Sequence, residues 1–210
     1  MHALNIKMKS FVQKNWNLNK YDMIRSCFDF FISLILLVIA VPICFFACIA
    51  ISIETHGNPI YTQERVGLNG RRFKIYKLRS MFADAEKNGP KWASENDERI
   101  TKIGRLIRKI RIDELPQLIN ILKGDMSFIG PRPERPELIE IFLKDIPDFN
   151  DRLLVKPGIT GWAQVQGGYS LTPKEKLIYD KYYIKNRGLK LDFLILVKTI
   201  HVVFTGNGAR

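Results

Sequence analysis

The stretch FFISLILLVIAVPICFFACIAISI, residues 30–53, decides what fold this chain can adopt. Its 24 residues carry no charge, and about 20 apolar residues are enough for an α-helix to cross the hydrocarbon core of a bilayer. A signal peptide would have a shorter apolar region and a shorter leader. The sequence therefore predicts a membrane-bound protein.

Pro42 lies close to the middle of this stretch. A proline inside a helix removes a backbone hydrogen bond and clashes with the preceding turn, so we expect a kink or a reversal there. A kink would leave a single membrane span, which is the common outcome of proline in membrane helices. A reversal would produce a re-entrant helix over residues 22–54, entering and leaving by the same face.

Basic residues flank the apolar stretch on both sides, and both flanks therefore fit the cytoplasmic side by the positive-inside rule. This symmetry favours the re-entrant alternative. Residues 1–21 form either a basic interfacial leader helix or a solvated leader. The flanking cations are Lys7, Lys9, Lys14, Lys20 and Arg25 before the stretch, and Arg65, Arg71, Arg72, Lys74, Lys77 and Arg79 after it.

Composition narrows the choice of partners. The 210 residues include 33 Lys and Arg against 21 Asp and Glu, a formal net charge of +12, which indicates polyanionic partners such as nucleic acid, anionic lipid or phosphorylated small molecules. No nucleic-acid-binding motif is present, and an apolar 24-mer is unexpected in such a protein. Cys27, Cys44 and Cys48 all lie in or beside the apolar stretch, which fits a reducing compartment and neither a disulfide framework nor a thiolate metal site.

The remainder of the chain predicts an α+β fold that is predominantly helical. Asn69-Gly70 between two β-rich runs is typical of a hairpin turn. Apolar positions at helical spacing predict an amphipathic basic helix from Thr101 to Ile110, a second helix over residues 115–122, and a helical tail with a break near residues 186–188. The last part of the tail is too short and too charged to span a membrane, so it either lies at the interface or packs on the core.

Two adjacent carboxylates, Asp113 and Glu114, follow the basic helix within the sequence RIDELPQL, residues 111–118. With Pro116 in the first turn of the second helix, Asp113 falls at or near its N-cap, where the helix dipole stabilises a carboxylate. Asp113 is then either a cap only or a reactive group. Loops rich in glycine and proline carry Arg132, Arg135 and Lys156 and are suited to holding phosphates.

These parts together predict chemistry on a phosphorylated substrate at a membrane face. A carboxylate can attack phosphorus and form an acyl-phosphate. Its neighbour can hold Mg²⁺, which prefers carboxylate and phosphate oxygens, while cations neutralise the diphosphate. The sequence contains no HExxH, CxxC, GxSxG or Walker A motif, and so offers no competing catalytic set.

The segments FKIYKLRSM (73–81), RKIRIDELPQLINILKGDMSFIGPRP (108–133) and KPGITGWAQV (156–165) resemble those of the bacterial polyprenol-phosphate phosphoglycosyl transferases with a monotopic, re-entrant membrane domain. The resemblance covers roughly residues 22–205 and is to the minimal members. It implies a catalytic domain, residues 55–210, on the cytoplasmic face of the bacterial inner membrane. The implied reaction transfers a sugar-1-phosphate from a nucleotide sugar, usually UDP-linked, to undecaprenyl phosphate. Nucleoside monophosphate is released in this first step of surface-glycan assembly.

The resemblance also implies roles for individual residues. Asp113 would be the nucleophile and Glu114 would bind Mg²⁺. The anion-binding candidates are Arg108, Arg132, Lys156, Lys77 and Arg79.

In the family that the chain resembles, the membrane helix is often broken at a Ser-Pro pair, whereas this chain has Val41-Pro42. Valine has no hydroxyl to satisfy a carbonyl freed by the proline. Asp29 and Arg25 match an acidic and a basic position before the membrane helix.

The alternative from another class is a non-catalytic, membrane-anchored scaffold that binds acidic lipids or a glycan-assembly partner. The sequence makes no prediction of the sugar, the downstream glycan or the oligomeric state.

Overall fold

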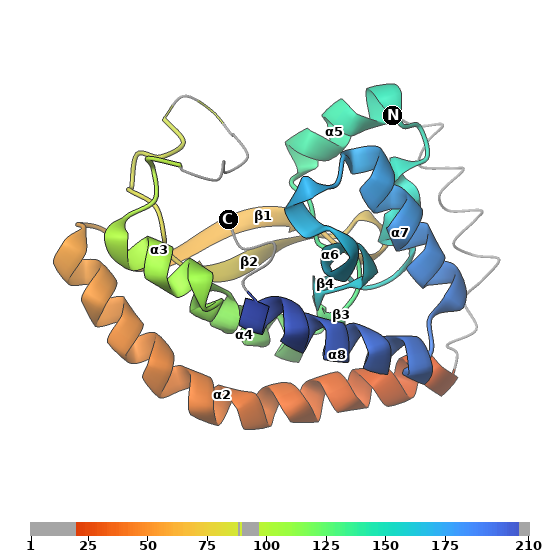
Figure 1. The fold of residues 1–210 in the computed structure, drawn as a ribbon, viewed down its shortest axis with the longest axis horizontal. Coiled ribbons are helices and arrows are strands. Elements are labelled where there is room, and N and C mark those ends of the chain that lie inside the picture. The colour runs from red at the N-terminus through yellow and green to blue at the C-terminus, as the bar shows by residue number, and fades with distance from the viewer. Residues whose placement is uncertain (1–19, 88, 90–96, 206–210) are drawn as a thin grey trace.

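The computed structural model describes residues 20–87, 89 and 97–205, and the predicted leader falls almost wholly outside them. The described chain is predominantly helical with two small sheets, which confirms the predicted fold class at this level (Figure 1). Its elements are α2 (Lys20–Glu54), β1 (Ile60–Val66), η1 (Leu68–Gly70), β2 (Arg72–Leu78), α3 (Lys102–Lys109), η2 (Ile112–Gln117), α4 (Leu118–Leu122), β3 (Ser127–Ile129), α5 (Pro136–Asp145), η3 (Phe149–Leu154), β4 (Gly158–Thr160), α6 (Trp162–Gln166), η4 (Gly168–Ser170), α7 (Pro173–Asn186) and α8 (Leu189–Thr205).

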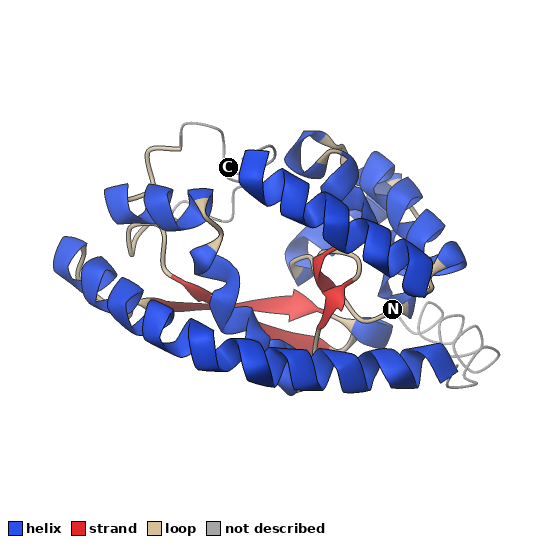
Figure 2. Ribbon diagram, turned by 60° about the horizontal axis from the view of Figure 1, so that its bottom comes forward, coloured by secondary structure: helices blue, strands red, loops and turns tan. Residues whose placement is uncertain are grey.

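Helix α2 is a single curved helix of 35 residues that passes through Pro42 without interruption. The predicted break of the helix at the proline is therefore not present, while the re-entrant topology stays a prediction. Instead the helix bends along its length, with the other elements on its concave side in both views (Figures 1 and 2). Most of its apolar side chains are exposed, among them Val38 at 76% and Ile53 at 81%. An apolar surface of this kind needs lipid around it.

Both ends of α2 are tied to the same folded body. At the N-terminal end, the Tyr21 hydroxyl donates to Asp192 of α8 at 2.5 Å. At the other end, the Glu54 carboxylate accepts from the backbone N–H groups of Lys102 and Ile103 at 2.7 and 2.9 Å. Arg79 adds hydrogen bonds to the carbonyl oxygens that follow the helix. Both ends of the long apolar helix are thus held by one folded body.

The predicted hairpin is confirmed: β1 and β2 pair antiparallel, from Ile60 opposite Leu78 to Val66 opposite Arg72. Asn69 and Gly70 both have positive φ, at 56° and 80°, which is the conformation that an Asn-Gly turn supplies. The inner face of the hairpin forms a core with α2 and α4. Its buried residues are Ala40, Phe73, Ile75, Leu118, Ile121 and Met126.

A second, parallel pair of short strands was not predicted from the sequence. Ser127 of β3 lies opposite Gly158 of β4, and Ile129 lies opposite Thr160. The pairing brings the two loops rich in glycine and proline together. A Cβ atom on Gly158 would lie 2.1 Å from the Gly130 nitrogen, so glycine is required for this approach.

The tail forms two helices, α7 and α8, separated by a break at Arg187-Gly188, as predicted. Thr172 and Glu175 form a capping box at the start of α7. Helix α8 buries Ile195 completely but leaves Phe193 69% exposed. One face of α8 therefore packs on the core, and its opposite face is apolar and open, as the predicted interfacial position requires.

At Gly104, helix α3 packs closely against the segment that follows β2. We therefore expect a substitution there to affect stability. A Cβ atom there would lie 2.0 Å from the carbonyl oxygen of Ser80. Alanine is the better helix former by about 1 kcal/mol, but a clash with rigid backbone outweighs that gain. We expect Gly104→Ala to destabilise the protein by about 1–3 kcal/mol. A thermal-unfolding midpoint no lower than that of Arg105→Ala, an exposed change on the same helix, would contradict this.

Candidate active site

The Asp113-Glu114 pair lies in the 3₁₀ turn η2, directly between α3 and α4. Arg111 precedes this turn in the left-handed conformation, with φ 60° and ψ 16°, a conformation that costs a non-glycine residue roughly 1–2 kcal/mol. The N-cap residue of this turn is Arg111, and Asp113 lies near it in the first turn, as predicted, but no side chain caps the turn. Asp113 is therefore not explained by capping.

Glu114 is held by two cations from opposite directions. Lys77 of β2 donates to its Oε1 atom at 3.1 Å, and Arg132 donates to the same atom at 2.5 Å. Burial alone would raise the pKa of Glu114, but Arg132, Lys77 and Arg111 together hold that pKa well below its usual range. The lowered pKa favours the ionised form of Glu114, which hydrogen-bonds Arg132 and Lys77 and fixes them in place.

Asp113 is buried beside this cluster but responds in the opposite direction. Burial raises the pKa of Asp113, and the negative charge of Glu114 raises it further, against the opposing effect of Lys77, Arg108 and Arg132. Two adjacent carboxylates whose pKa values are driven apart are typical of an active site. Glu114 organises the cations, and Asp113 is left as the more basic of the two carboxylates.

A polar cavity of about 470 Å³ opens over this pair. It is lined by side chains of the hairpin, the segment after β2, α3 and the loop between β3 and α5. Its charged residues are Arg65, Lys77, Arg79, Glu86, Arg108, Arg111, Asp113, Glu114, Arg132, Glu134, Arg135 and Lys176. The cations outnumber the acids, eight against four on this list, and the cavity therefore suits an anionic ligand the size of a diphosphate ester.

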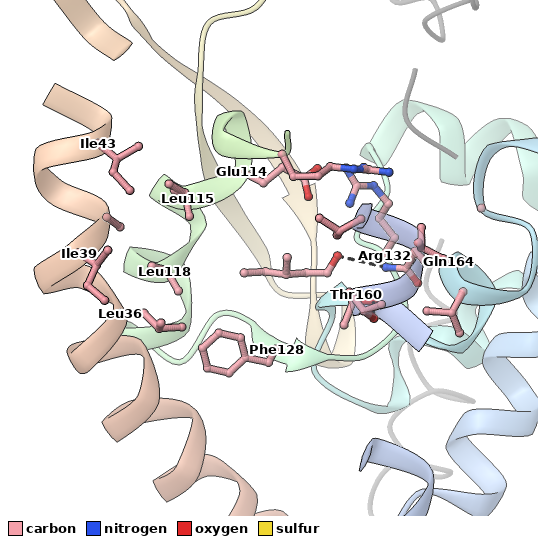
Figure 3. A pocket seen from close by; sticks show the side chains of 18 residues that line it. Leu36, Ile39, Ile43, Glu114, Leu115, Leu118, Phe128, Arg132, Thr160 and Gln164 are labelled. Atoms are coloured by element: carbon pink, nitrogen blue, oxygen red, sulfur yellow. Dashed lines mark hydrogen bonds and ion pairs between the residues drawn. The ribbon is translucent and has the colours of Figure 1, made fainter. Parts of the chain in front are cut away.

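A second cavity, of about 320 Å³, is mainly apolar and lies beside α2. In Figure 3, Leu36, Ile39 and Ile43 of α2 lie on one side, while Thr160 and Gln164 lie on the other. Thr160 and Thr199 hydrogen-bond to each other at 2.7 Å, which satisfies their hydroxyls within this apolar wall. This cavity was not predicted from the sequence, because its lining comes from helices α2, α4 and α8 and from β4, which are far apart in the chain.

The two cavities share three lining residues, Arg111, Glu114 and Arg132. Glu114 and Arg132 stand at the polar end of the apolar cavity in Figure 3. Asp113 lines only the polar cavity. An anionic group at the shared wall could therefore be reached from either side, next to Asp113.

The remaining site candidates from the sequence are placed differently. Arg108 lines the polar cavity and donates to Ser80 at 3.4 Å. Arg79 also lines it, but its guanidinium is engaged by the carbonyl oxygens of Thr55 and His56 at the end of α2. Lys156 lines neither cavity, and its charge acts instead on Asp29 of α2. Arg135, which the sequence placed in a loop suited to phosphate, lines the polar cavity. Arg65 and Arg111 also line it and were not singled out for it from the sequence.

Within the described ranges, no group of three or more His, Cys, Asp or Glu side chains gathers to hold a metal. Mg²⁺, however, is commonly bound through only one or two carboxylates, with substrate phosphates and water completing its shell. Asp113 and Glu114 fit that limited donor set. They do not form a preformed metal cage.

The opposed electrostatics of the pair predict how pH would affect the attack by Asp113 that the sequence predicts. For that role the carboxylate must be ionised, and its raised pKa would place the acid limb of kcat/KM above pH ~4, the ordinary value for aspartate. Lys77→Met removes a charge that lowers the Asp113 pKa, so the limb moves to higher pH. Glu114→Gln removes a charge that raises it, so the limb moves to lower pH. Shifts of the same sign in a pH series of nucleoside monophosphate release would contradict this assignment.

The model of the bacterial sugar transferase family matches residues 20–206, nearly all of the described chain. The chain belongs to that family.

Relatives within it carry more particular names. The chain is 44% identical over 193 residues to the UDP-N-acetylgalactosamine-undecaprenyl-phosphate N-acetylgalactosaminephosphotransferase of Aeromonas hydrophila, covering 90% of this chain and 46% of that protein. It is 56% identical over 134 residues to a putative undecaprenyl-phosphate N-acetylgalactosaminyl 1-phosphate transferase of Bacillus subtilis, covering 64% and 75%. It is 36% identical to the undecaprenyl-phosphate galactose phosphotransferase of Salmonella typhimurium, covering 94% and 44%. The chain thus spans about half the length of the first and the third.

Proposed function

We propose that this protein is a phosphoglycosyl transferase that moves a sugar-1-phosphate from a nucleotide diphosphate sugar, of the UDP-linked type, to undecaprenyl phosphate. The observation that carries the proposal is the shared wall between a cationic and an apolar cavity, with Asp113 beside it. One cavity suits a water-soluble diphosphate and the other suits a polyprenyl chain. The names of the relatives support the same general reaction.

In the first step, a carboxylate oxygen of Asp113 attacks the phosphorus that carries the sugar. The bond from this phosphorus to the bridging oxygen breaks, and nucleoside monophosphate leaves with the electron pair. Lys77, Arg108 and Arg132 neutralise the charge that develops on the phosphoryl and leaving oxygens. The product is a phosphosugar ester of Asp113, an acyl-phosphate.

In the second step, a phosphate oxygen of undecaprenyl phosphate attacks the same phosphorus. The acyl-phosphate bond breaks, Asp113 regains its carboxylate, and the sugar leaves on a polyprenyl diphosphate. The apolar cavity holds the first part of the polyprenyl chain while Arg111 and Arg132, at the shared wall, receive its phosphate. This product is the starting lipid for a surface glycan.

Mg²⁺ belongs to the proposal as a partner of Glu114 and of donor phosphate oxygens. It would supply further neutralisation of the diphosphate. Lys77 and Arg132 hold Glu114 ionised and oriented for that role.

Helix α2 is proposed to lie in the cytoplasmic leaflet of the bacterial inner membrane as a monotopic, re-entrant element. At a rise of 1.5 Å per residue it is roughly 52 Å long, longer than a hydrocarbon core needs. Its two ends nevertheless bind the same domain, which a straight span would separate by a membrane. Labelling of single cysteines at both ends tests this, and opposite-side labelling would contradict it.

Filling the apolar cavity should separate the two half-reactions. Leu36 lines this cavity from α2, whereas its neighbour Ile35 is 65% exposed and lines neither cavity. We expect Leu36→Trp to slow transfer to undecaprenyl phosphate by about tenfold or more, a loss of roughly 1.4 kcal/mol, with single-turnover release of nucleoside monophosphate unchanged. Equal loss in both half-reactions, or an equal effect of Ile35→Trp, would contradict the assignment of this cavity.

The proposed scaffold alternative rests on the net charge of +12 and the exposed apolar face of α2. A screen of nucleotide sugars with Mg²⁺ and undecaprenyl phosphate separates the two functions. The enzyme releases nucleoside monophosphate with at least one of them. A scaffold releases none with any donor.

A further inference from the structure

Four successive backbone carbonyls, from Pro131 to Glu134, hold the loop that carries Arg132. Pro131 accepts from Gly158 N–H at 3.0 Å, and Glu134 accepts from Val66 N–H at 3.0 Å. Between them, the carbonyls of Arg132 and Pro133 accept from two arginine side chains, Arg152 at 2.8 Å and Arg65 at 3.2 Å. Since prolines on both sides of Arg132 limit the backbone hydrogen bonds that this loop can donate, these four acceptor contacts determine where the loop lies.

Arg152 is the most deeply buried of these donors. It is 4% exposed, stacks over the Phe149 ring at 5.0 Å, and forms an ion pair with Asp180 of α7 at 2.9 Å. Asp180 itself is 1% exposed, and it lines neither the polar nor the apolar cavity. The same nitrogen of Arg152 contacts both Asp180 and the Arg132 carbonyl.

Stability alone is a poor explanation of this buried pair. Removing two charges from water costs several kcal/mol per ion, and apolar replacements of buried ion pairs are often neutral or stabilising. What the pair supplies is direction, because the planar guanidinium lies against Asp180 and donates from the same nitrogen to the Arg132 carbonyl. That carbonyl belongs to the residue whose side chain bonds Glu114.

We propose that Arg152 and Asp180 are positioning residues that act through Arg132. Asp180 orients Arg152, Arg152 fixes the Arg132 carbonyl, and the Arg132 side chain is thereby set against Glu114 at the wall shared by the two cavities. Neither residue touches substrate. The proposal rests on the proposed function for its kinetic readout, but its structural readout is independent of that function.

A double-mutant cycle tests it. Arg152→Met/Asp180→Leu replaces the pair with apolar side chains and is expected to keep the fold. With Arg132 present, we expect the replacement to lower the rate of nucleoside monophosphate release by about tenfold or more; in an Arg132→Ala background, we expect a loss of less than about twofold. Lys181→Ala, which removes an exposed ion pair on the same helix, is the control and should change neither rate. If the apolar pair prevents folding, Arg152→Lys replaces it in the same cycle.

Hydrogen exchange gives the independent readout. Backbone amides within residues 126–135 should exchange faster in the replaced protein than in wild type, while those of the β1–β2 hairpin away from Val66 stay protected. Equal losses of rate in both Arg132 backgrounds, or unchanged rate and exchange, would overturn the proposal. If the wild-type protein released no nucleoside monophosphate, the proposed function would fail instead, and hydrogen exchange would still decide the positioning role.

Discussion

Asp113→Asn is expected to abolish transfer, lowering turnover by about 10⁴-fold or more, as loss of a covalent nucleophile does elsewhere. The amide keeps the shape of the carboxylate but cannot attack phosphorus. Both half-reactions should disappear together, because nucleoside monophosphate release depends on the same oxygen. The measurement is single-turnover release, with Asp125→Asn as a control acid outside both cavities.

The same variant should not unfold the protein. Burial raises the pKa of Asp113, so its ionised form is less favourable in the folded than in the unfolded state, and stability falls as pH rises through that window. A neutral asparagine removes this cost at neutral pH. We therefore expect a thermal-unfolding midpoint equal to or above that of wild type, and turnover within tenfold of wild type would contradict the role of Asp113.

Arg132→Ala is the second large effect. This side chain bonds Glu114 at 2.5 Å and lines both cavities. Its loss therefore removes a cation from both half-reactions and leaves Glu114 with the hydrogen bond from Lys77. Removal of one group that stabilises transition-state charge costs about 10²–10³ in kcat. We expect a loss of that size in release from the nucleotide sugar and in transfer to the lipid.

Arg72→Ala supplies the matched control. Its guanidinium pairs with Glu64 on the surface, with both side chains at least half exposed, and such pairs contribute little to stability. It removes the same charge from the protein without touching either cavity. A loss confined to one half-reaction, or a loss in Arg132→Ala no larger than in Arg72→Ala, would contradict the shared-wall arrangement.

The parts of the fold that could be predicted are those specified by local patterns. The Asn-Gly turn predicted the hairpin, helical spacing from Thr101 predicted α3, and Arg187-Gly188 predicted the break between α7 and α8. Strands β3 and β4 have only three residues each, too few to show a period, and their pairing joins segments about thirty residues apart. The predicted break at Pro42 is absent because a helix can absorb one proline by bending.

The candidate site likewise has features that local sequence patterns predict and features that arise only when the elements pack. The adjacency of Asp113 and Glu114 and the presence of nearby cations were visible in the sequence, because all belong to short motifs. Arg152 and Asp180 were not, because their link to Arg132 exists only after η3 and α7 have packed. The apolar cavity is likewise a product of packing, since no single segment contributes more than a few of its lining residues.

The central claim is that Asp113 carries a phosphosugar between two substrates. Its most direct test is the intact mass of the wild-type protein after incubation with Mg²⁺ and a nucleotide sugar that supports release, in the absence of undecaprenyl phosphate. We expect a mass increase equal to one sugar phosphate, located on Asp113 by peptide mapping and lost when undecaprenyl phosphate is added. Lipid-dependent release of nucleoside monophosphate without any adduct would show direct transfer between substrates and would contradict it.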